Sequence, residues 1–107
     1  MSALVVVDAE NVRRSTWPNL SREELVERAR AWAEREGHVL VIVFDGEPPA
    51  DGADLAGAPH ADDLVAELVR DAPDGSVWVV TSDRELRGRV GDRAERLVGG
   101  GTFVRLL

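Results

Sequence analysis

Three short apolar runs limit the possible fold more than any other feature of the chain. They span residues 3–7, 38–44 and 76–81 and read ALVVV, HVLVIVF and SVWVVT. β-Branched residues dominate each run, and apolar side chains follow one another without the alternation of a half-exposed strand. Such runs are typical of strands that are buried on both faces, as in parallel sheets. Residues 96–98 form a weaker candidate for a fourth strand.

Helical patterns lie between these runs. The first spans residues 21–37 and opens on a capping box formed by Ser21 and Glu24. The second spans residues 60–70, and the third spans residues 82–90 and opens on another capping box, which makes its first residue the expected helix cap. Because strands and helices alternate, we expect a parallel sheet with helices on both faces.

The predicted fold is therefore α/β, a small three-layer sandwich with a mostly parallel sheet of about four strands. A single domain is expected to span residues 1–107. Residues 46–59 contain three prolines, three glycines and no periodicity, so we expect an irregular loop there. An Asp-Gly pair predicts a turn at residues 74–75, and the tail at residues 102–107 has no predicted structure.

Composition excludes several classes of function. The chain contains no cysteine, which excludes disulfide frameworks, zinc ribbons, thiolate catalysis and iron–sulfur ligation. No apolar run approaches the roughly 18 residues of a membrane span, and the N-terminus lacks a secretion signal, so we expect a cytoplasmic protein. The formal net charge of −7 argues against purely electrostatic binding of nucleic acid.

Acidic residues follow all three apolar runs. Asp8, Asp45 and Asp83 stand at the ends of the three predicted strands. The carboxyl ends of parallel strands lie on one edge of a sheet, where ligands bind in open α/β folds, so these carboxylates should converge. Asp62 and Asp63 lie in the first turn of the helix after the long loop, and the same topology can bring them to this edge.

Converging carboxylates repel one another unless a cation is present. Mg²⁺ and Mn²⁺ prefer oxygen ligands, and two such ions can activate water and stabilise the leaving oxygen of a phosphodiester. Without these five aspartates the chain has 15 acidic residues against 13 arginines, so most of its net acidity would belong to the site. The pattern therefore predicts a metal-dependent phosphodiesterase site.

Each acidic residue also has a structural interpretation. A lone Asp after a strand is often a turn former, and acidic residues suit the first turn of any helix. Asn11 either fixes a carboxylate or phosphate, or caps a helical turn at residues 12–15. Ser82 either caps the last predicted helix or orients Asp83. Arginines near the acidic residues either clamp phosphate or lie on solvated helix faces; they are Arg13, Arg14, Arg84 and Arg87.

A histidine and the tryptophans leave further alternatives. His60 either shuttles protons beside the acidic residues or is merely exposed to solvent. Trp17 lies in a predicted loop, where it either stacks on a base or packs against the first long helix. Trp32 falls on the apolar stripe of its helix, which favours the core.

Four motifs in order give the chain a family resemblance. Residues 5–12 (VVVDAENV) resemble the opening motif of NYN domains in the PIN-like ribonuclease superfamily, an apolar strand, Asp, two residues and Asn. The segments VFDG at 43–46, ADDLV at 61–65 and VVTSD at 79–83 resemble later motifs of the YacP-like branch. The ordered set covers roughly residues 3–98.

The resemblance implies a PIN-like fold and an Mg²⁺- or Mn²⁺-dependent endoribonuclease, a nuclease that hydrolyses RNA. Carried over by motif, Asp8, Asp62 and Asp83 would be catalytic metal ligands and Asp45 and Asp63 auxiliary ones. By the same resemblance, Asn11 and Ser82 would orient metal ligands or substrate. From their place beside the acidic residues, we expect Arg13 and Arg84 to bind the RNA substrate as well.

Two departures from the family keep a second interpretation open. Glu10, with Ala9, stands where family members often have Gly-Tyr, and it either adds a carboxylate or points away. The segment after the second strand is a Pro/Gly loop where relatives carry more helix and more basic residues. The alternative is therefore a catalytically weak or inactive PIN-like module that binds RNA or protein, with a protein or ribosome partner supplying positive surface.

Overall fold

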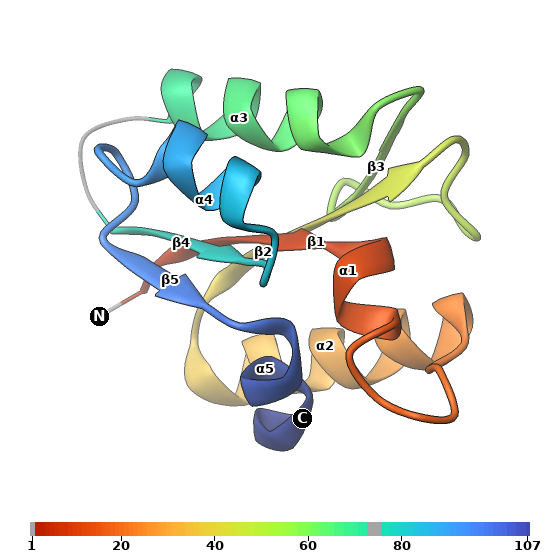
Figure 1. Cartoon of the computed structure of the whole chain (residues 1–107). Coiled ribbons are helices and arrows are strands. Elements are labelled where there is room, and N and C mark those ends of the chain that lie inside the picture. The colour runs from red at the N-terminus through yellow and green to blue at the C-terminus, as the bar shows by residue number, and fades with distance from the viewer. Residues whose placement is uncertain (1, 73–75) are drawn as a thin grey trace.

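The computed structural model describes residues 2–72 and 76–107 of the chain. Strands and helices alternate through most of it (Figure 1). The elements in order are β1 (Leu4–Asp8), α1 (Ala9–Arg13), α2 (Arg22–Glu36), β2 (Val39–Asp45), β3 (Leu55–Ala58), α3 (Ala61–Asp71), β4 (Val77–Val80), α4 (Arg84–Val90), β5 (Arg96–Val98) and α5 (Gly100–Leu106). The predicted turn at residues 74–75 lies outside the described residues.

All five strands form one parallel sheet in the order β3-β2-β1-β4-β5. The three apolar runs became β1, β2 and β4, and the weaker candidate at residues 96–98 became β5. The α/β class and the parallel sheet are confirmed, whereas the expected number of about four strands was one too low.

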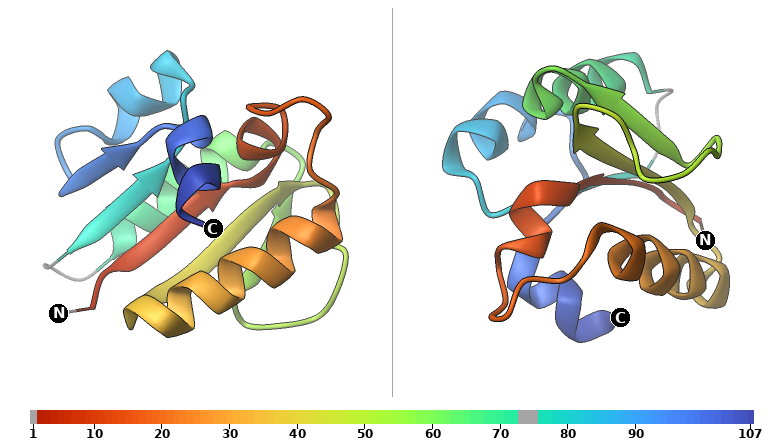
Figure 2. Two further views of the ribbon diagram at one scale, coloured as in Figure 1. Left: turned by 90° about the horizontal axis from the view of Figure 1, so that it is seen from below. Right: turned by 90° about the vertical axis from the view of Figure 1, so that its right-hand side faces the viewer.

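Helices cover both faces of this sheet, as the three-layer prediction required. Helices α3 and α4 lie on one face, and α1, α2 and α5 lie on the other (Figures 1 and 2). Strand β1 feeds both layers, since Val5 and Val7 belong to the core beneath α2 and Val6 belongs to the core beneath α3. A strand buried on both faces explains why its sequence lacks alternation.

The long helix α2 begins and ends as its sequence predicts. The Ser21 side chain accepts a hydrogen bond from the backbone N–H of Glu24 at 3.0 Å. Gly37 ends the helix with φ of 73°, a left-handed conformation that glycine adopts without steric cost. Trp32 is buried against the sheet, so the core interpretation of this side chain is confirmed.

The irregular loop expected at residues 46–59 contains a strand instead. Strand β3 pairs with β2 at the edge of the sheet, and a double hydrogen bond from Arg30 to Asp54, at 2.7 and 2.9 Å, anchors the segment before it to α2. A Cβ on Gly57 would lie 2.1 Å from the carbonyl oxygen of Gly46, so this pairing requires a glycine. The sequence of β3, LAGA, has no β-branched residue, which is why pattern analysis missed it.

The unassigned tail forms most of helix α5. The sequence of α5 opens with two glycines, which are poor helix formers. Packing compensates, because Phe103 is only 1% exposed and meets the Trp32 ring edge-on with 5.0 Å between ring centres. No helix in the described part of the chain is long and apolar enough to cross a membrane.

Candidate active site

The topology creates a crevice at the carboxyl edge of the sheet. From β1 the chain builds outward through β2 to β3, then returns to the other side of β1 for β4 and β5. The connections that leave β1 and β4 therefore diverge, and ligands bind at such switch points in open α/β sheets. A cleft of about 200 Å³ opens there, with Asp8, Asp45, Asp62 and Asp83 in its lining. The structure thus brings four of the five predicted acidic residues together.

Asp8 is the most enclosed of these carboxylates. It is the last residue of β1 and only 9% exposed. Its Oδ2 accepts a hydrogen bond at 3.0 Å from Oγ1 of Thr81, a fully buried residue that follows β4. Burial raises the pKa of Asp8 above its ordinary value, the Thr81 hydroxyl and the Asn11 backbone N–H oppose that rise, and the charges of Asp45 and Asp83 add to it.

Asp83 is held by the start of α4. Its Oδ1 accepts hydrogen bonds from the backbone N–H groups of Glu85 at 2.9 Å and Leu86 at 3.2 Å. Asp83 is therefore the helix cap, and the prediction that Ser82 caps this helix is wrong. The Ser82 hydroxyl instead accepts from the backbone N–H of Gly100, and the Thr81 hydroxyl accepts from the N–H of Asp83.

Asn11 connects the first strand end to the loop after β4. Helix α1 begins at Ala9, directly after Asp8, so Asn11 lies inside a helix and the interpretation as a helix cap is wrong. Its side-chain oxygen accepts the backbone N–H of Ser82 at 2.8 Å. The amide thereby fixes the segment that carries Asp83, and Asn11 also lines the cleft.

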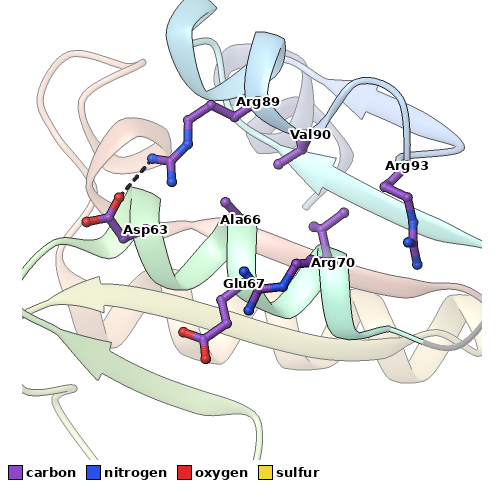
Figure 3. A pocket seen from close by; sticks show the side chains of 8 residues that line it. Asp63, Ala66, Glu67, Arg70, Arg89, Val90 and Arg93 are labelled. Atoms are coloured by element: carbon purple, nitrogen blue, oxygen red, sulfur yellow. Dashed lines mark hydrogen bonds and ion pairs between the residues drawn. The ribbon is translucent and has the colours of Figure 1, made fainter.

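Asp45, at the end of β2, positions the start of α3, and the two acidic residues in the first turn of α3 face different surroundings. Asp45 accepts the backbone N–H of Ala61 at 2.9 Å, which sets the beginning of α3 beside the strand end. Asp62 lines the cleft, whereas Asp63 lines a separate hollow between α3 and α4 and pairs with Arg89 at 2.9 Å (Figure 3). Consecutive residues of a helix point about 100° apart, so the structure does not bring Asp63 into the cleft.

The four arginines predicted near the acidic residues do not all reach the cleft. Arg14 lines the cleft, while Arg13 donates to the Leu20 carbonyl at 2.8 Å and pairs with Glu10. Arg84 is exposed and is not part of the cleft lining. Arg87 donates to the backbone carbonyl of Thr81 at 2.8 Å, so it supports the strand end. Sequence analysis assigned no role to Thr81, although this residue ends the third apolar run and belongs to the VVTSD motif.

Glu10 also lines the cleft but is already paired. It is buried and accepts from Arg13 at 2.5 Å and from Arg22 at 3.2 Å. Two guanidinium groups therefore balance its charge, and the structure shows an ion-paired carboxylate at this departure from the family motif.

The remaining candidates lie at the surface. His60 is exposed at the N-cap of α3 and makes no side-chain capping bond. Trp17 is 90% exposed in the connection between α1 and α2, so the interpretation that it packs against a helix is wrong. Base stacking by this side chain stays a prediction.

The cleft suits a divalent cation in the kind of ligand that it offers. Asp8, Asp45, Asp62 and Asp83 supply oxygen atoms, the ligands that Mg²⁺ and Mn²⁺ prefer. Over residues 2–72 and 76–107, no three acidic or histidine side chains lie close enough to form a ready-made metal cage. Mg²⁺ is usually held by one or two carboxylates, several waters and substrate phosphate, so the residues present fit this mode of binding.

Comparisons with known proteins point to the same architecture. No protein-family model matches the sequence, and no curated protein matches it. The structure is similar to a crystal structure of a variant of Rae1 (YacP) from Bacillus subtilis, with a TM-score of 0.79, 16% sequence identity, and coverage of 96% of this chain and 73% of that one. The chain has a PIN-like fold. The fold implied by the NYN resemblance is thus confirmed, and at this identity the likeness speaks for the fold alone.

Proposed function

We propose that the chain is a metal-dependent PIN-like ribonuclease that hydrolyses phosphodiester bonds within RNA in the cytoplasm. One observation carries the proposal. Four aspartates that come from four separate segments of the chain line a single cleft at the switch point of a PIN-like sheet. One domain over residues 1–107 would hold the whole site.

The carboxylates divide into roles according to their surroundings. Asp8, Asp62 and Asp83 would hold Mg²⁺ or Mn²⁺, with Asp45 as an auxiliary ligand. Bound divalent cations supply an activated water and neutralise charge on the phosphate. Thr81 orients Asp8, and the backbone N–H groups at the start of α4 orient Asp83. Asp63 pairs with Arg89 outside the cleft, so we do not propose it as a direct metal ligand.

Contacts to RNA would come from residues around the mouth of the cleft. Arg14 lines the cleft and can donate two parallel hydrogen bonds to a phosphate. Asn11 and Ser82 are bonded to each other and hold the loop after β4 in place. Trp17 lies three residues beyond Arg14, so its Cα is within about 11 Å of that of Arg14, near enough to stack on a neighbouring base.

A second candidate is a PIN-like module that binds RNA or protein without cleaving it. It is favoured by the lack of a three-carboxylate metal cage in the described residues and by Arg89, which lies 3.8 Å from Asp62. In that case, the acidic residues would remain as parts of the fold, and a partner such as the ribosome would supply the positive surface.

An RNA-cleavage assay in Mg²⁺ and in Mn²⁺ separates the two candidates. Wild-type protein should cleave within a labelled single-stranded RNA, and Asp8→Asn and Asp83→Asn should abolish cleavage. Asp92→Asn is the matched control, because Asp92 is an exposed acidic residue that does not line the cleft. Loss of cleavage by chelation and by both site variants, but not by the control, supports the ribonuclease. RNA binding with no cleavage in either metal would favour the binding module.

A further inference from the structure

A second hollow lies between α3 and α4, beside the cleft. Its volume is about 380 Å³, at the lower end of the about 300–1,000 Å³ range of small-ligand pockets. Ala66, Val69 and Val90 give it apolar walls, and three arginines reach it: Arg70, Arg89 and Arg93 (Figure 3).

Weak contacts hold these arginines. Arg89 pairs with two exposed carboxylates, Asp63 at 2.9 Å and Asp62 at 3.8 Å. Among the described residues, Arg70 pairs with its neighbour Asp71, and both side chains are more than 60% exposed. Arg93 donates to a backbone carbonyl, that of Ala72 at 3.2 Å. Exposed ion pairs are worth little in water, so a phosphate can replace these partners at small cost.

The hollow adjoins the cleft directly. Asp62 lines the cleft and contacts Arg89, which lines the hollow. From Asp62 to Arg70 the helix rises about 12 Å at 1.5 Å per residue. The three arginines therefore line the hollow between α3 and α4, which begins at the edge of the acidic cleft.

The negative net charge of the chain makes a local cluster of arginines important for binding RNA. The chain carries a net charge of −7, which repels a polyanion unless cationic groups gather locally. Among the described residues that line the hollow are three arginines and two acidic residues, and Figure 3 shows the carboxylate of one of these, Glu67, turned away from Arg89 and Arg93. Guanidinium groups can bind phosphate oxygens in pairs, which gives them an advantage over a simple point charge.

We propose that the α3–α4 hollow, lined by Arg70, Arg89 and Arg93, binds backbone phosphates of single-stranded RNA next to the cleft. The inference rests on the proposed function for the identity of the ligand. It adds a binding surface outside the carboxylate cluster. The surface would guide the strand toward the cleft and offset the acidity of the chain.

Binding of a short fluorescein-labelled single-stranded RNA, followed by fluorescence anisotropy in EDTA, tests this without cleavage. The variant is Arg89→Gln combined with Arg93→Gln. We expect its affinity to fall about tenfold at low salt, with the slope of log affinity against log salt reduced by about 1.4, since each phosphate contact contributes about 0.7. The matched control is Arg35→Gln combined with Arg105→Gln, which removes the same charge from α2 and α5 on the opposite face (Figure 1).

Each outcome decides the inference separately from the ribonuclease. Equal affinity of the wild type and the Arg89/Arg93 double variant, equal losses in this variant and the control, or absence of binding by the wild type would overturn the inference, whatever the cleavage assay shows. Competition by a poly-glutamate peptide at least as strong as that by unlabelled RNA would identify an acidic protein partner and overturn the assignment to RNA. If the double variant melts early, Arg89→Gln alone serves, because its ion-pair partners are exposed carboxylates.

Discussion

Thr81 and Asp8, which are 73 residues apart in the sequence, share a buried hydrogen bond of 3.0 Å between Oγ1 and Oδ2. The same hydroxyl oxygen accepts the backbone N–H of Asp83 at 3.1 Å. One small side chain therefore sets the carboxylate at the end of β1 and the turn that carries Asp83. This arrangement makes the geometry of the cleft depend on a residue that does not line it.

Replacing Thr81 with valine should loosen both acidic residues at once. Thr81→Val keeps the shape but leaves a buried carboxylate oxygen and an N–H without a partner, at a cost of about 1–3 kcal/mol in the free energy of unfolding. Urea denaturation measures this loss. Thr102→Val, at an exposed position on α5, should change stability by less than about 0.5 kcal/mol. Equal effects of the two substitutions would contradict a special role for Thr81.

Asp8→Asn should stabilise the metal-free protein and remove its response to metal. The amide oxygen can still accept from Thr81, while the buried charge and its repulsion with Asp45 and Asp83 disappear. We expect the melting midpoint in EDTA to rise by about 4 °C or more, the shift that roughly 1 kcal/mol produces in a domain of this size. Millimolar Mn²⁺ should raise the midpoint of the wild type only. A variant that melts below the wild type would make Asp8 a structural residue.

The pH dependence of stability should show the raised pKa of Asp8. In the absence of metal the fold favours the protonated carboxyl, so its contribution is complete below the ordinary pKa of 3.8 and is lost as pH rises through the raised value. The difference in unfolding free energy between Asp8→Asn and wild type should therefore grow across this interval and then level off. Affinity for Mg²⁺ should increase over the same interval, because the ion binds the carboxylate. A difference independent of pH would contradict the assignment.

Gly57→Ala should disrupt the edge of the sheet. The new Cβ would lie 2.1 Å from the Gly46 carbonyl oxygen, which is backbone and cannot rotate away, so we expect a loss of about 1–3 kcal/mol or more. Gly88→Ala is the control, since its Cβ would meet nothing within 4 Å inside α4 and should add about 0.5–1 kcal/mol. Opposite signs in a chemical denaturation series would support the pairing of β3 with β2.

Trp17→Ala should weaken RNA binding and leave stability unchanged. A stacked base contributes about 1–3 kcal/mol to binding, whereas a side chain that is 90% exposed contributes little to folding. Val39→Ala removes another exposed apolar side chain, at the amino end of β2, and should not affect RNA binding. Affinities measured with labelled RNA in EDTA would exclude stacking if Trp17→Ala bound as tightly as Val39→Ala.

Local sequence signals predicted the fold where each element carries its own pattern. The runs that became β1, β2 and β4 are β-branched and buried on both faces, and the Ser21 cap of α2 is purely local. Strand β3 could not be predicted, because its residues gain strand structure only by pairing with β2. Helix α5 likewise depends on packing between Phe103 and Trp32, which no local propensity reveals.

The candidate site was predictable at the level of topology but not of side-chain partners. Parallel strands bring Asp8, Asp45 and Asp83 to one edge whatever their neighbours are. Which of Asp62 and Asp63 enters the cleft depends on how α3 is rotated, and the sequence allowed both. The N-cap of α4 is Asp83 and not the predicted Ser82. The Ser82 hydroxyl bonds to Gly100 instead, a partner that becomes a neighbour only in the folded chain.

The strand order also has a consequence for how the protein is made. Strand β1 lies at the centre of the sheet, and its partner β4 pairs Leu4 with Val77. During synthesis, β1 leaves the ribosome well before β4, so its second edge stays uncovered until the segment around Val77 follows. Contacts between residues so distant in sequence slow folding. The nascent chain therefore exposes an apolar strand edge until β4 emerges, and this is the interval in which these strands are most prone to aggregate.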